Sequence, residues 1–429
     1  MKKILLPAIA LGAFIASTGA EAAGYHLSEY TTTGLGRSFA GVGVMGDDYS
    51  AIGFNPAGMQ YNKQSGGQVG VTMVSLHTDY KGTSESHPMG QPVEKTGYGH
   101  TRPTRVLPNV FAQHKLNDKM TLGLGAYVPF GLATDYKNGW FGENHAELSQ
   151  VSAQTVSPSL SYQVTDTIAL GAAVNLQYIE AKLTGAIEKD IGGSLPVAIP
   201  GATNNLRGDD MGVGYTLGLT YTPRKDVRLG VSYRSKVKHK LEGDVKLTGI
   251  PSQVTAATGI ANGNKDIYTK ITTPEVLTFS GAWDMNKCFT LTGTARWTRW
   301  SQFDRLDIYE KETGDLLTGT YENWKNTWYY AIGLDYRRNQ NWTFRTGIGY
   351  DETVIKSPEY RTARIPDGRR VLTSLGLSYK KNNWQIDAGY MHIFIHGSHA
   401  YGTADGASKM DMKYTSSADL LSFGVQYKF

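Results

Sequence analysis

Four segments of this chain alternate residue by residue between two chemically different faces. In the last of them, residues 420–429, the apolar face carries Leu421, Phe423, Val425, Tyr427 and Phe429. The opposite face carries Ser422, Gly424, Gln426 and Lys428. Because side chains of a β-strand point alternately to its two sides, this period of two predicts a strand.

The same alternation recurs in residues 227–234, 328–337 and 342–351. One face of each segment is aliphatic or aromatic, with aromatic residues toward the ends, and the other is small, polar or charged. Strands of a soluble β-sandwich also alternate, but apolar faces bounded by aromatic residues are typical of strands that cross an outer membrane. The pattern therefore predicts strands with one face toward lipid and the other toward a polar lumen.

The spacing of the turns predicts the number of strands. Short polar turns occur at residues 117–118, 165–166, 224–226, 286–287, 339–341 and 382–383. Longer irregular segments are expected near residues 82–103, 131–147, 184–208, 245–267, 307–320, 357–368 and 398–412. Alternating short and long connections match periplasmic turns and extracellular loops. We therefore predict an all-β fold, a transmembrane antiparallel β-barrel of about 14 strands with both ends in the periplasm.

The start of the chain has the features of a secretory signal. Lys2 and Lys3 precede an apolar run, and a small-residue site ends at Ala22, so residues 1–22 are assigned to a signal peptide. Residues 65–429 are assigned to the barrel. Residues 23–64 are rich in glycine and contain no spanning strand. Because lipid tolerates only closed walls, we expect this segment inside the lumen, as a hatch or plug.

Composition argues against several other classes of protein. The 43 basic and 38 acidic residues are spread along the chain, whereas a nucleic-acid surface needs a clustered basic patch. Cys288 is the single cysteine, so neither an intramolecular disulfide nor a cysteine-based metal site can form. His392 and His396 would lie about 13 Å apart along a strand, too far to share an ion. We expect no cofactor, no metal and no nucleic-acid partner.

Residues 125–136, GAYVPFGLATDY, interrupt a segment that otherwise has the pattern of a membrane strand. Proline cannot donate to a sheet ladder, and glycine weakens a strand interior. The residues alone leave two interpretations open. The interruption is either an ordinary bulge that leads into a loop or a gap built into the barrel wall.

Three stretches of the mature chain resemble the long-chain fatty acid transporter (FadL) family of outer-membrane proteins, which also includes importers of toluene-like aromatics. The mature start, AGYHLSEY followed by GLGR, resembles the family's hatch, and Asn55-Pro-Ala-Gly58 resembles its N-P-A motif. Residues 130–136, FGLATDY, resemble the segment after the family's kinked third strand. A weaker match is RIPDGR at residues 364–369. The resemblance extends in order over essentially the whole mature chain.

The resemblance implies that the third strand kinks inward and leaves a gap in the wall. Hydrophobic substrate would leave sideways through this gap into the outer leaflet. Entry into lipid is favourable by roughly 0.8 kcal/mol per buried CH₂, so this step needs no nucleotide. Pro129 has no N–H to leave unpaired, and Gly131 permits a sharp bend. The predicted gate residues are Val128, Pro129, Phe130 and Gly131, with Val128 at the gate edge.

The predicted hatch residues are Tyr25, Asn55, Pro56 and Ala57. Asn55 can bond to local backbone and Pro56 fixes φ, so the pair could hold a tight turn that closes the lumen. Whether this turn is static or shifts when ligand arrives stays open. Tyr25 is included because the family's mature N-terminus carries an aromatic residue close to the bound ligand.

A fatty-acid site should be mostly apolar, with a lumenal Arg or Lys for the carboxylate. Where fatty-acid importers carry a basic residue, this chain has Gly185, a departure that favours uncharged substrates. The candidate carboxylate partners are Lys182, Arg228, Arg234, Arg296 and Arg345. The four arginines also fit an ordinary charge network of the lumen.

The sequence thus predicts a monomer in the outer membrane of a Gram-negative bacterium that takes up hydrophobic molecules passively. Long-chain fatty acids are the first choice of substrate and monoaromatic hydrocarbons the second, and both would pass to outer-membrane lipids. The strand ending in Phe429 is expected to engage the barrel-assembly machinery. A general porin, a loop-borne adhesin or phage receptor, and an acyl hydrolase are the alternatives, but no Ser/His/Asp arrangement points to an enzyme.

Overall fold

A computed structural model describes residues 24–88, 91–136, 139–190, 196–402 and 408–429. The predicted signal peptide, residues 1–22, lies outside the described residues. Among the described helices, none is long and apolar enough to cross a membrane.

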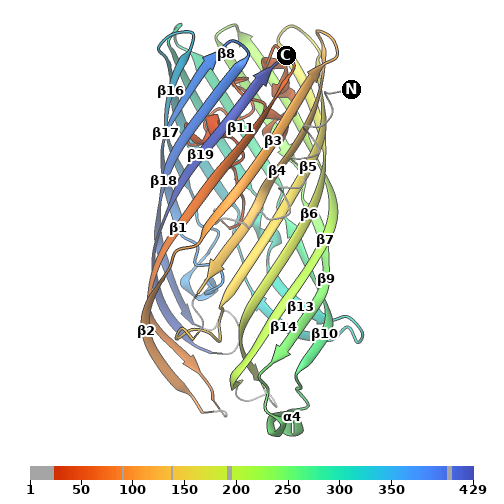
Figure 1. The fold of residues 1–429 in the computed structure, drawn as a ribbon, viewed down its shortest axis with the longest axis vertical. Coiled ribbons are helices and arrows are strands. Elements are labelled where there is room, and N and C mark those ends of the chain that lie inside the picture. Colours follow the sequence, from red (N-terminus) through yellow and green to blue (C-terminus); the bar gives the residue numbers. More distant parts are fainter. Residues whose placement is uncertain (1–23, 89–90, 137–138, 191–195, 403–407) are drawn as a thin grey trace.

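The wall of the molecule is a single antiparallel sheet that closes on itself (Figure 1). The first half of the chain contributes β1 (Gly66–Ser86), β2 (Val93–Thr101), β3 (Thr104–Lys115), β4 (Met120–Asp135), β5 (Leu148–Gln163), β6 (Ile168–Asp190), β7 (Pro196–Arg224), β8 (Val227–Arg234) and β9 (Val237–Thr248). The second half contributes β10 (Gly263–Thr273), β11 (Val276–Asp284), β12 (Phe289–Thr298), β13 (Arg305–Glu310), β14 (Leu316–Tyr321), β15 (Thr327–Arg337), β16 (Trp342–Asp351), β17 (Arg369–Lys381), β18 (Trp384–Gly402) and β19 (Met410–Lys428).

Several of these segments are two parts of one spanning strand. β2 and β3 are two such parts, because both pair with β1, and β8 and β9 are two parts of another, because both pair with β7. The same holds for β10 with β11, β12 with β13, and β14 with β15, because each pair of segments faces the same neighbouring strands. Counted in this way, the described residues form 14 spanning strands, and β1 closes the barrel on β19. The predicted fold class is confirmed.

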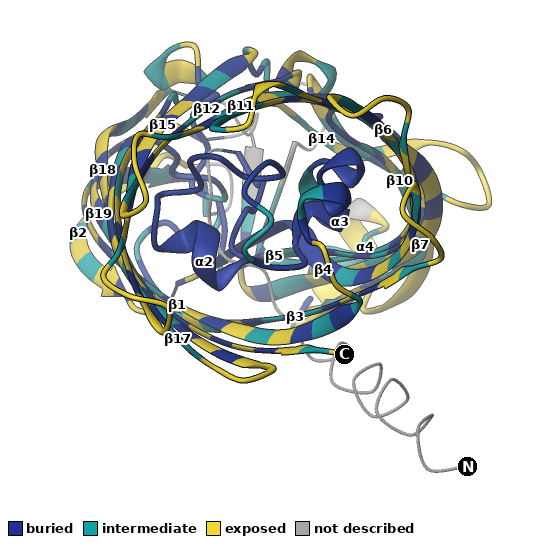
Figure 2. Cartoon of the chain, turned by 90° about the horizontal axis from the view of Figure 1, so that it is seen from above, coloured by how far each residue is buried: buried dark blue, intermediate teal, exposed yellow. Residues whose placement is uncertain are grey.

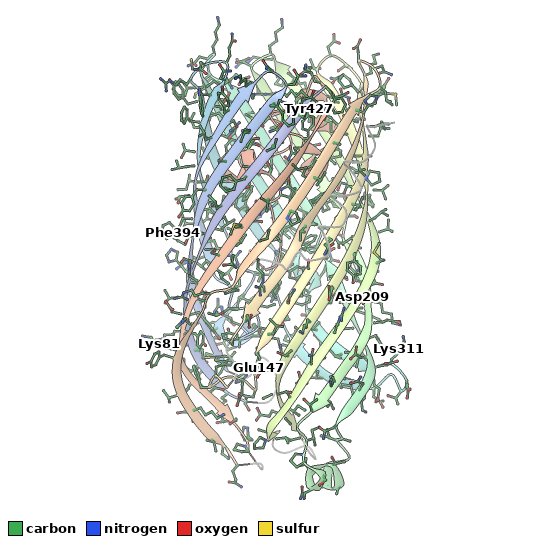
Figure 3. The ribbon with its side chains drawn as sticks, viewed as in Figure 1. Lys81, Glu147, Asp209, Lys311, Phe394 and Tyr427 are labelled. Carbon is green, nitrogen blue, oxygen red and sulfur yellow. The ribbon has the colours of Figure 1, made fainter. Side chains whose placement is uncertain are left out.

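The alternation in the sequence corresponds to the two faces of the wall. Ile332 is 62% exposed on the outer face, whereas Ser422 and Gln426 are buried toward the lumen. Tyr427 lies near the end of the barrel that holds the C-terminus, and the charged residues Lys81 and Lys311 lie in the opposite half (Figure 3). The apolar outer face is the surface that lipid covers.

The six predicted short turns fall between β3 and β4, β5 and β6, β7 and β8, β11 and β12, β15 and β16, and β17 and β18. One expectation about the opposite end is wrong. Much of segments 82–103, 184–208 and 307–320 is strand, not irregular loop; β6 pairs with β7 as far as Asp190 and Pro196, and β13 pairs with β14. The strands of these hairpins stay hydrogen-bonded to each other, but neither of their faces is covered by lipid. Their sequences therefore lack the alternation that marks membrane strands.

The N-terminal segment lies inside the barrel (Figure 2). It contains α2 (Thr32–Leu35), α3 (Ala51–Phe54) and the 3₁₀ helix η2 (Pro56–Tyr61), and nearly all its residues are buried. We call residues 24–62 the hatch. The remaining short helices are α4 (Ser252–Thr258), η3 (Trp300–Gln302) and η4 (Pro358–Tyr360).

Replacing Ile332 by Arg should lower the free energy of unfolding by about 2–4 kcal/mol, because it places a charge on the lipid face near the middle of a strand. Denaturant titration of the barrel refolded in lipid vesicles measures this change. The matched control is Trp384→Arg, which is also exposed but follows a turn at the strand end. The control should cost no more than about 1 kcal/mol. Equal costs would contradict the assignment of this face to lipid.

Candidate ligand cavity and lateral gate

The wall lacks one stretch of ladder between β3 and β4. Pairing between these strands runs from Lys115 opposite Thr121 to Val110 opposite Ala126, and it stops there. Among the described strands, β5 alone pairs with the rest of β4, as far as Asp135. The corresponding part of β3, residues 104–109, pairs within the described residues with β1 alone. A gap in the hydrogen-bonded wall therefore separates residues 104–109 from residues 127–135.

β4 turns inward at this gap. Its register with β5 shifts between Tyr127 and Phe130, which places Val128 and Pro129 in a bulge. Residues 127–134 are all buried, whereas a strand in the wall would expose every second residue to lipid. Bulges bend a strand and increase its twist. Both faces of this part of β4 are therefore covered by other parts of the protein.

The first residues of the hatch pair with the bulge. The N–H of Leu27 donates to the Pro129 carbonyl at 2.8 Å, and the N–H of Gly131 donates to the Tyr25 carbonyl at 2.7 Å. His26 between them forms a bridge with Phe130. The structure thus brings the predicted gate residues and the predicted hatch residue Tyr25 together. The edge of β4 that β3 leaves unpaired finds part of its hydrogen bonding inside the barrel.

Side chains close the gap in this structure. Val128 belongs to an apolar cluster that includes Leu107 of β3, Leu76 of β1 and Leu27 of the hatch. Phe130 belongs to a second cluster, with Tyr25. The bulge therefore divides two apolar regions of the lumen, and Val128 lies with the β3 side of the gap.

An apolar cavity occupies the barrel beside the second cluster. It is lined by Tyr25, Leu132, Val151, Ala181, Leu183, Leu206, Leu241, Ile267, Ile271, Phe303, Leu306, Ile308 and Ile365, together with a few polar residues. The Tyr25 hydroxyl donates to the Thr272 carbonyl at 3.3 Å, and its ring packs edge-on against Trp300. Tyr25 thus stands between the cavity and the bulge of β4.

Arg364 brings a cation to this cavity. It lies in the segment before β17, and its Nη1 donates to Ser149 Oγ at 3.2 Å and to the Thr184 carbonyl at 3.4 Å. A Cβ atom placed on Gly185 would lie 3.6 Å from Arg364 Nη2. A guanidinium from elsewhere in the chain therefore occupies the space beside Gly185. Sequence reasoning did not select Arg364 as a candidate, although the RIPDGR stretch contains it.

Lys182 lies away from the cavity. Its neighbours Ala181 and Leu183 line the cavity, so Lys182 projects from the opposite face of β6. The structure thus places Lys182, one of the candidate carboxylate partners, outside the lining of the cavity. We do not retain it as a candidate carboxylate partner.

The four candidate arginines contact the hatch and do not line the apolar cavity. Arg228 donates to the Met45 carbonyl at 3.0 Å and pairs with Asp284 at 3.1 Å. Arg296 donates to Ser28 Oγ at 2.5 Å. Arg234 donates to the Gly53 carbonyl and, at 3.1 Å, to the Tyr127 hydroxyl.

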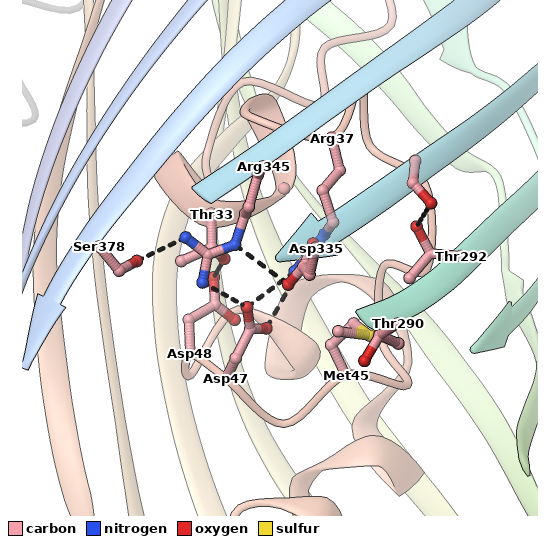
Figure 4. A network of polar contacts seen from close by, with 12 residues as sticks. Thr33, Arg37, Met45, Asp47, Asp48, Thr290, Thr292, Asp335, Arg345 and Ser378 are labelled. Carbon is pink, nitrogen blue, oxygen red and sulfur yellow. Dashed lines mark hydrogen bonds and ion pairs between the residues drawn. The ribbon is translucent and has the colours of Figure 1, made fainter. Parts of the chain in front are cut away.

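The fourth arginine, Arg345, belongs to a buried ionic network (Figure 4). Asp47 of the hatch accepts from Arg37 at 2.8 Å and from Arg345 at 3.0 Å. Asp335 of β15 pairs with the same two arginines at 2.9 and 3.3 Å. Burial alone would raise the pKa of Asp47, but the two guanidinium groups outweigh it and hold this pKa far below its usual range. The network ties the hatch to β15 and β16.

The Asn55 turn is docked closely against the wall. Asn55 Oδ1 accepts the N–H of Ala57 at 3.1 Å, and Pro56 begins η2. Asn55 Nδ2 donates to the Leu219 carbonyl at 3.1 Å. A Cβ atom on Gly218 would lie 2.0 Å from Asn55 Oδ1, so this wall position must be glycine for the turn to fit.

Comparison with known proteins agrees with this geometry. Residues 13–429 match the family model described as outer membrane protein transport protein (OMPP1/FadL/TodX). The chain is 29% identical to a putative outer membrane protein of Neisseria meningitidis, over 98% of this chain and 97% of the relative. It is 27% identical to a long-chain fatty acid transport protein of Escherichia coli K12, over 90% and 91% of the two chains.

Solved structures of similar proteins share this fold. A FadL homologue of Pseudomonas aeruginosa superposes with a TM-score of 0.87 at 25% identity, covering 95% of this chain and 100% of the other. The toluene transporter TodX of Pseudomonas putida has a TM-score of 0.66 at 18% identity, covering 95% and 100%. The latter likeness shows the fold alone.

Replacing Gly218 by Val should displace the Asn55 turn while the barrel still assembles, because the new side chain collides with Asn55 and not with the strand ladder. We expect a larger single-channel conductance in planar bilayers. Gly281→Val is the matched control, since a Cβ there meets only the Leu229 side chain at 3.5 Å and the Arg228 carbonyl at 3.9 Å, both ordinary contact distances. Unchanged conductance of a folded Gly218→Val barrel would contradict a closing role for this turn.

Proposed function

This chain belongs to the OMPP1/FadL/TodX family of outer-membrane transport proteins, and we propose that it takes up long-chain fatty acids. The fatty acid would bind in the apolar cavity and leave sideways between β3 and β4 into the outer leaflet. The observation that carries this proposal is the position of Arg364. Its guanidinium lines a mostly apolar cavity, whose other charged lining residues are Arg207 and Glu322, and lies beside Gly185.

The lining of the cavity supports an elongated amphiphile. Aliphatic side chains from β4 to β7, β9, β10 and β13 would surround an alkyl chain, and removal of the chain from water favours binding by about 0.8 kcal/mol per CH₂. A carboxylate accepts well from a guanidinium because the hydrogen bond is charge-assisted. Arg364 would hold the head group, and its bonds to Ser149 and Thr184 fix its orientation.

The missing ladder supports lateral release. Tyr25 lines the cavity, its carbonyl accepts from Gly131, and Val128 lies in the cluster with Leu107 across the gap. A ligand that displaces Tyr25 would therefore disturb the two hydrogen bonds that hold the bulge. Separation of Val128 from Leu107 would then open the gap toward lipid. Backbone groups of β4 would still face protein or cavity, which a membrane wall requires.

Uptake of monoaromatic hydrocarbons is the second candidate. The apolar lining would also accept a small arene, and the neighbour named as a toluene transporter shares the fold. Arg364 separates the two possibilities, since its guanidinium can form a charge-assisted hydrogen bond with a carboxylate but not with an uncharged arene.

Replacing Val128 by Arg should abolish oleate uptake, because a long charged side chain would fill the apolar gap. The measurement is initial uptake of labelled oleate and labelled toluene in a host that lacks its own hydrophobe importer. Ile393→Arg is the matched control, since Ile393 of β18 belongs to the same apolar cluster but not to the gap. Heat-modifiable gel mobility verifies that each barrel has assembled. Normal oleate uptake by an assembled Val128→Arg barrel would contradict lateral release.

Replacing Arg364 by Met should weaken laurate binding about 10- to 100-fold, since a hydrogen bond to a charged group contributes about 1.5–3 kcal/mol. Binding of toluene should change little. Equilibrium binding of both ligands to the purified barrel measures the two effects. Lys182→Met removes a nearby cation that does not line the cavity, so it should leave both affinities unchanged. Equal loss of laurate and toluene binding in Arg364→Met would instead indicate damage to the cavity.

A further inference from the structure

A second, smaller cavity lies on the other side of the first hatch residues. His26, Tyr30 and Phe39 of the hatch line one side, and Arg234 of β8 and Arg296 of β12 line the other. We call it the inner cavity. Tyr25 faces the apolar cavity while the next residue, His26, faces the inner one. The two cavities are therefore separated by the part of the hatch that pairs with the β4 bulge.

Three buried nitrogen atoms of the inner cavity have no hydrogen-bond partner among the described residues. They are Nδ1 of His26, Nη1 of Arg234 and Nε of Arg296. The three residues are only 6%, 8% and 8% exposed. A buried polar atom without a partner costs free energy, so three around one cavity indicate that something completes their bonding.

The two guanidinium groups of this cavity also lack an ion-paired carboxylate. In the described part of the chain, neither Arg234 nor Arg296 has an Asp or Glu oxygen within 4.0 Å. The other two hatch-binding arginines of the wall differ, because Arg345 pairs with two carboxylates and Arg228 with one. Two buried guanidinium groups without a paired anion are costly, because desolvation is not repaid.

The hatch acid that interacts with Arg296 forms no ion pair with it. Glu29 interacts with Arg296 at longer range, and its Oε2 accepts the N–H of Ser28 at 2.6 Å. Burial raises the pKa of Glu29, which favours its neutral form. Asp351 at the end of β16 also interacts with Arg296 but forms no ion pair with it.

We propose that the inner cavity is an anion-binding subsite for a carboxylate, formed by Arg234, Arg296 and His26. The inference rests on the proposed function in one respect, the identification of the carboxylate with the head group of a fatty acid in transit. The same three groups would accept a free inorganic anion of similar size. The head group would pass from Arg364 to the inner cavity while the alkyl chain approaches the gap.

The chemistry of the three groups suits a carboxylate. The two guanidinium groups provide charge-assisted donors, and a neutral His26 provides one N–H. Burial, and then the charges of Arg296 and Arg234, lower the pKa of His26 well below its ordinary value, so the imidazole stays neutral. Phe39, Val42 and Val276 line the rest of the cavity and could cover the first methylenes.

Occupancy of this subsite would reach the gate through Arg234. Its guanidinium donates to the hydroxyl of Tyr127, the residue before the gate edge, and it lies 5.5 Å from the centre of that ring. It also holds the hatch through the Gly53 carbonyl. An anion bound at the free Nη1 of Arg234 would therefore act on a side chain whose Nη2 contacts both the kinked strand and the hatch.

Crystals of the mature protein test the proposal, one set soaked in sodium bromide and one grown with dodecanoate. We expect an anomalous bromide peak between Arg234, Arg296 and His26, or carboxylate density at the same place. Bromide alone would identify a free-anion site, and carboxylate density would identify a head-group site; each supports the subsite. Only water in the cavity, or the Glu29 carboxylate turned onto Arg296, in both crystals would overturn it.

Variants add a solution measurement. Arg234→Met with Arg296→Met should weaken dodecanoate binding at least tenfold and leave binding of dodecanol unchanged. Arg228→Met is the matched control, since Arg228 also holds the hatch but is paired with Asp284 and does not line the inner cavity. Equal losses for dodecanoate and dodecanol would overturn the proposal. The bromide crystals test the subsite even if wild type fails to import oleate, so the two proposals can fail separately.

Discussion

A barrel wall in lipid must satisfy its own backbone hydrogen bonds, and this requirement governs the structure around β4. The ladder between β3 and β4 stops at Ala126, yet the chain beyond it cannot face lipid with unpaired groups. β4 therefore turns inward, and residues 127–134 are covered on both faces. Pro129 removes one donor from the bulge, and hatch residues 25 and 27 pair with the groups on either side. The opening in the wall and the position of the hatch have the same physical origin.

The hatch is held by charge on one side and by apolar contact on the other. Asp47 of the hatch pairs with both Arg37 and Arg345. Moving Asp47 away from Arg345 would leave buried charges without partners, which is costly. Near the gap, Leu27 of the hatch packs in one apolar cluster with Val128 and Leu107, and two backbone hydrogen bonds join the hatch to β4. Apolar contacts and two bonds can rearrange at lower cost than the ionic network. Movement, where it occurs, should therefore be confined to the first hatch residues.

Much of the fold could be predicted from the sequence because lipid imposes a strict pattern. Strand faces, six short turns and the number of strands all follow from alternation between apolar and polar residues. Beyond the lipid this constraint ends, so the sequence predicts a loop at residues 184–208, where the structure has the ends of β6 and β7. For the same reason the sequence does not assign Lys182 to one face of its strand, because residues 178–185 of β6 lack a clean alternation.

The candidate site was less accessible to sequence reasoning because its groups come from distant segments. Gly185 indicated the loss of a cation, and nothing local indicated that Arg364 lies beside it. The roles of Arg234 and Arg296 likewise depend on which carboxylates are near them in space. Pro129 and Gly131 were informative because a proline and a glycine two residues apart disturb a strand locally.

The central claim is that the ligand leaves through the side of the barrel. The most direct measurement is photo-crosslinking during uptake, with a long-chain fatty acid that carries a diazirine, followed by mass spectrometry of the labelled peptides. Lateral release predicts labelling of β3 residues 104–109 and of β4 around Val128. Labelling concentrated at the turn end of the lumen, where Gln60 of the hatch bonds to the Lys119 carbonyl, would mean passage along the barrel axis and would contradict the account.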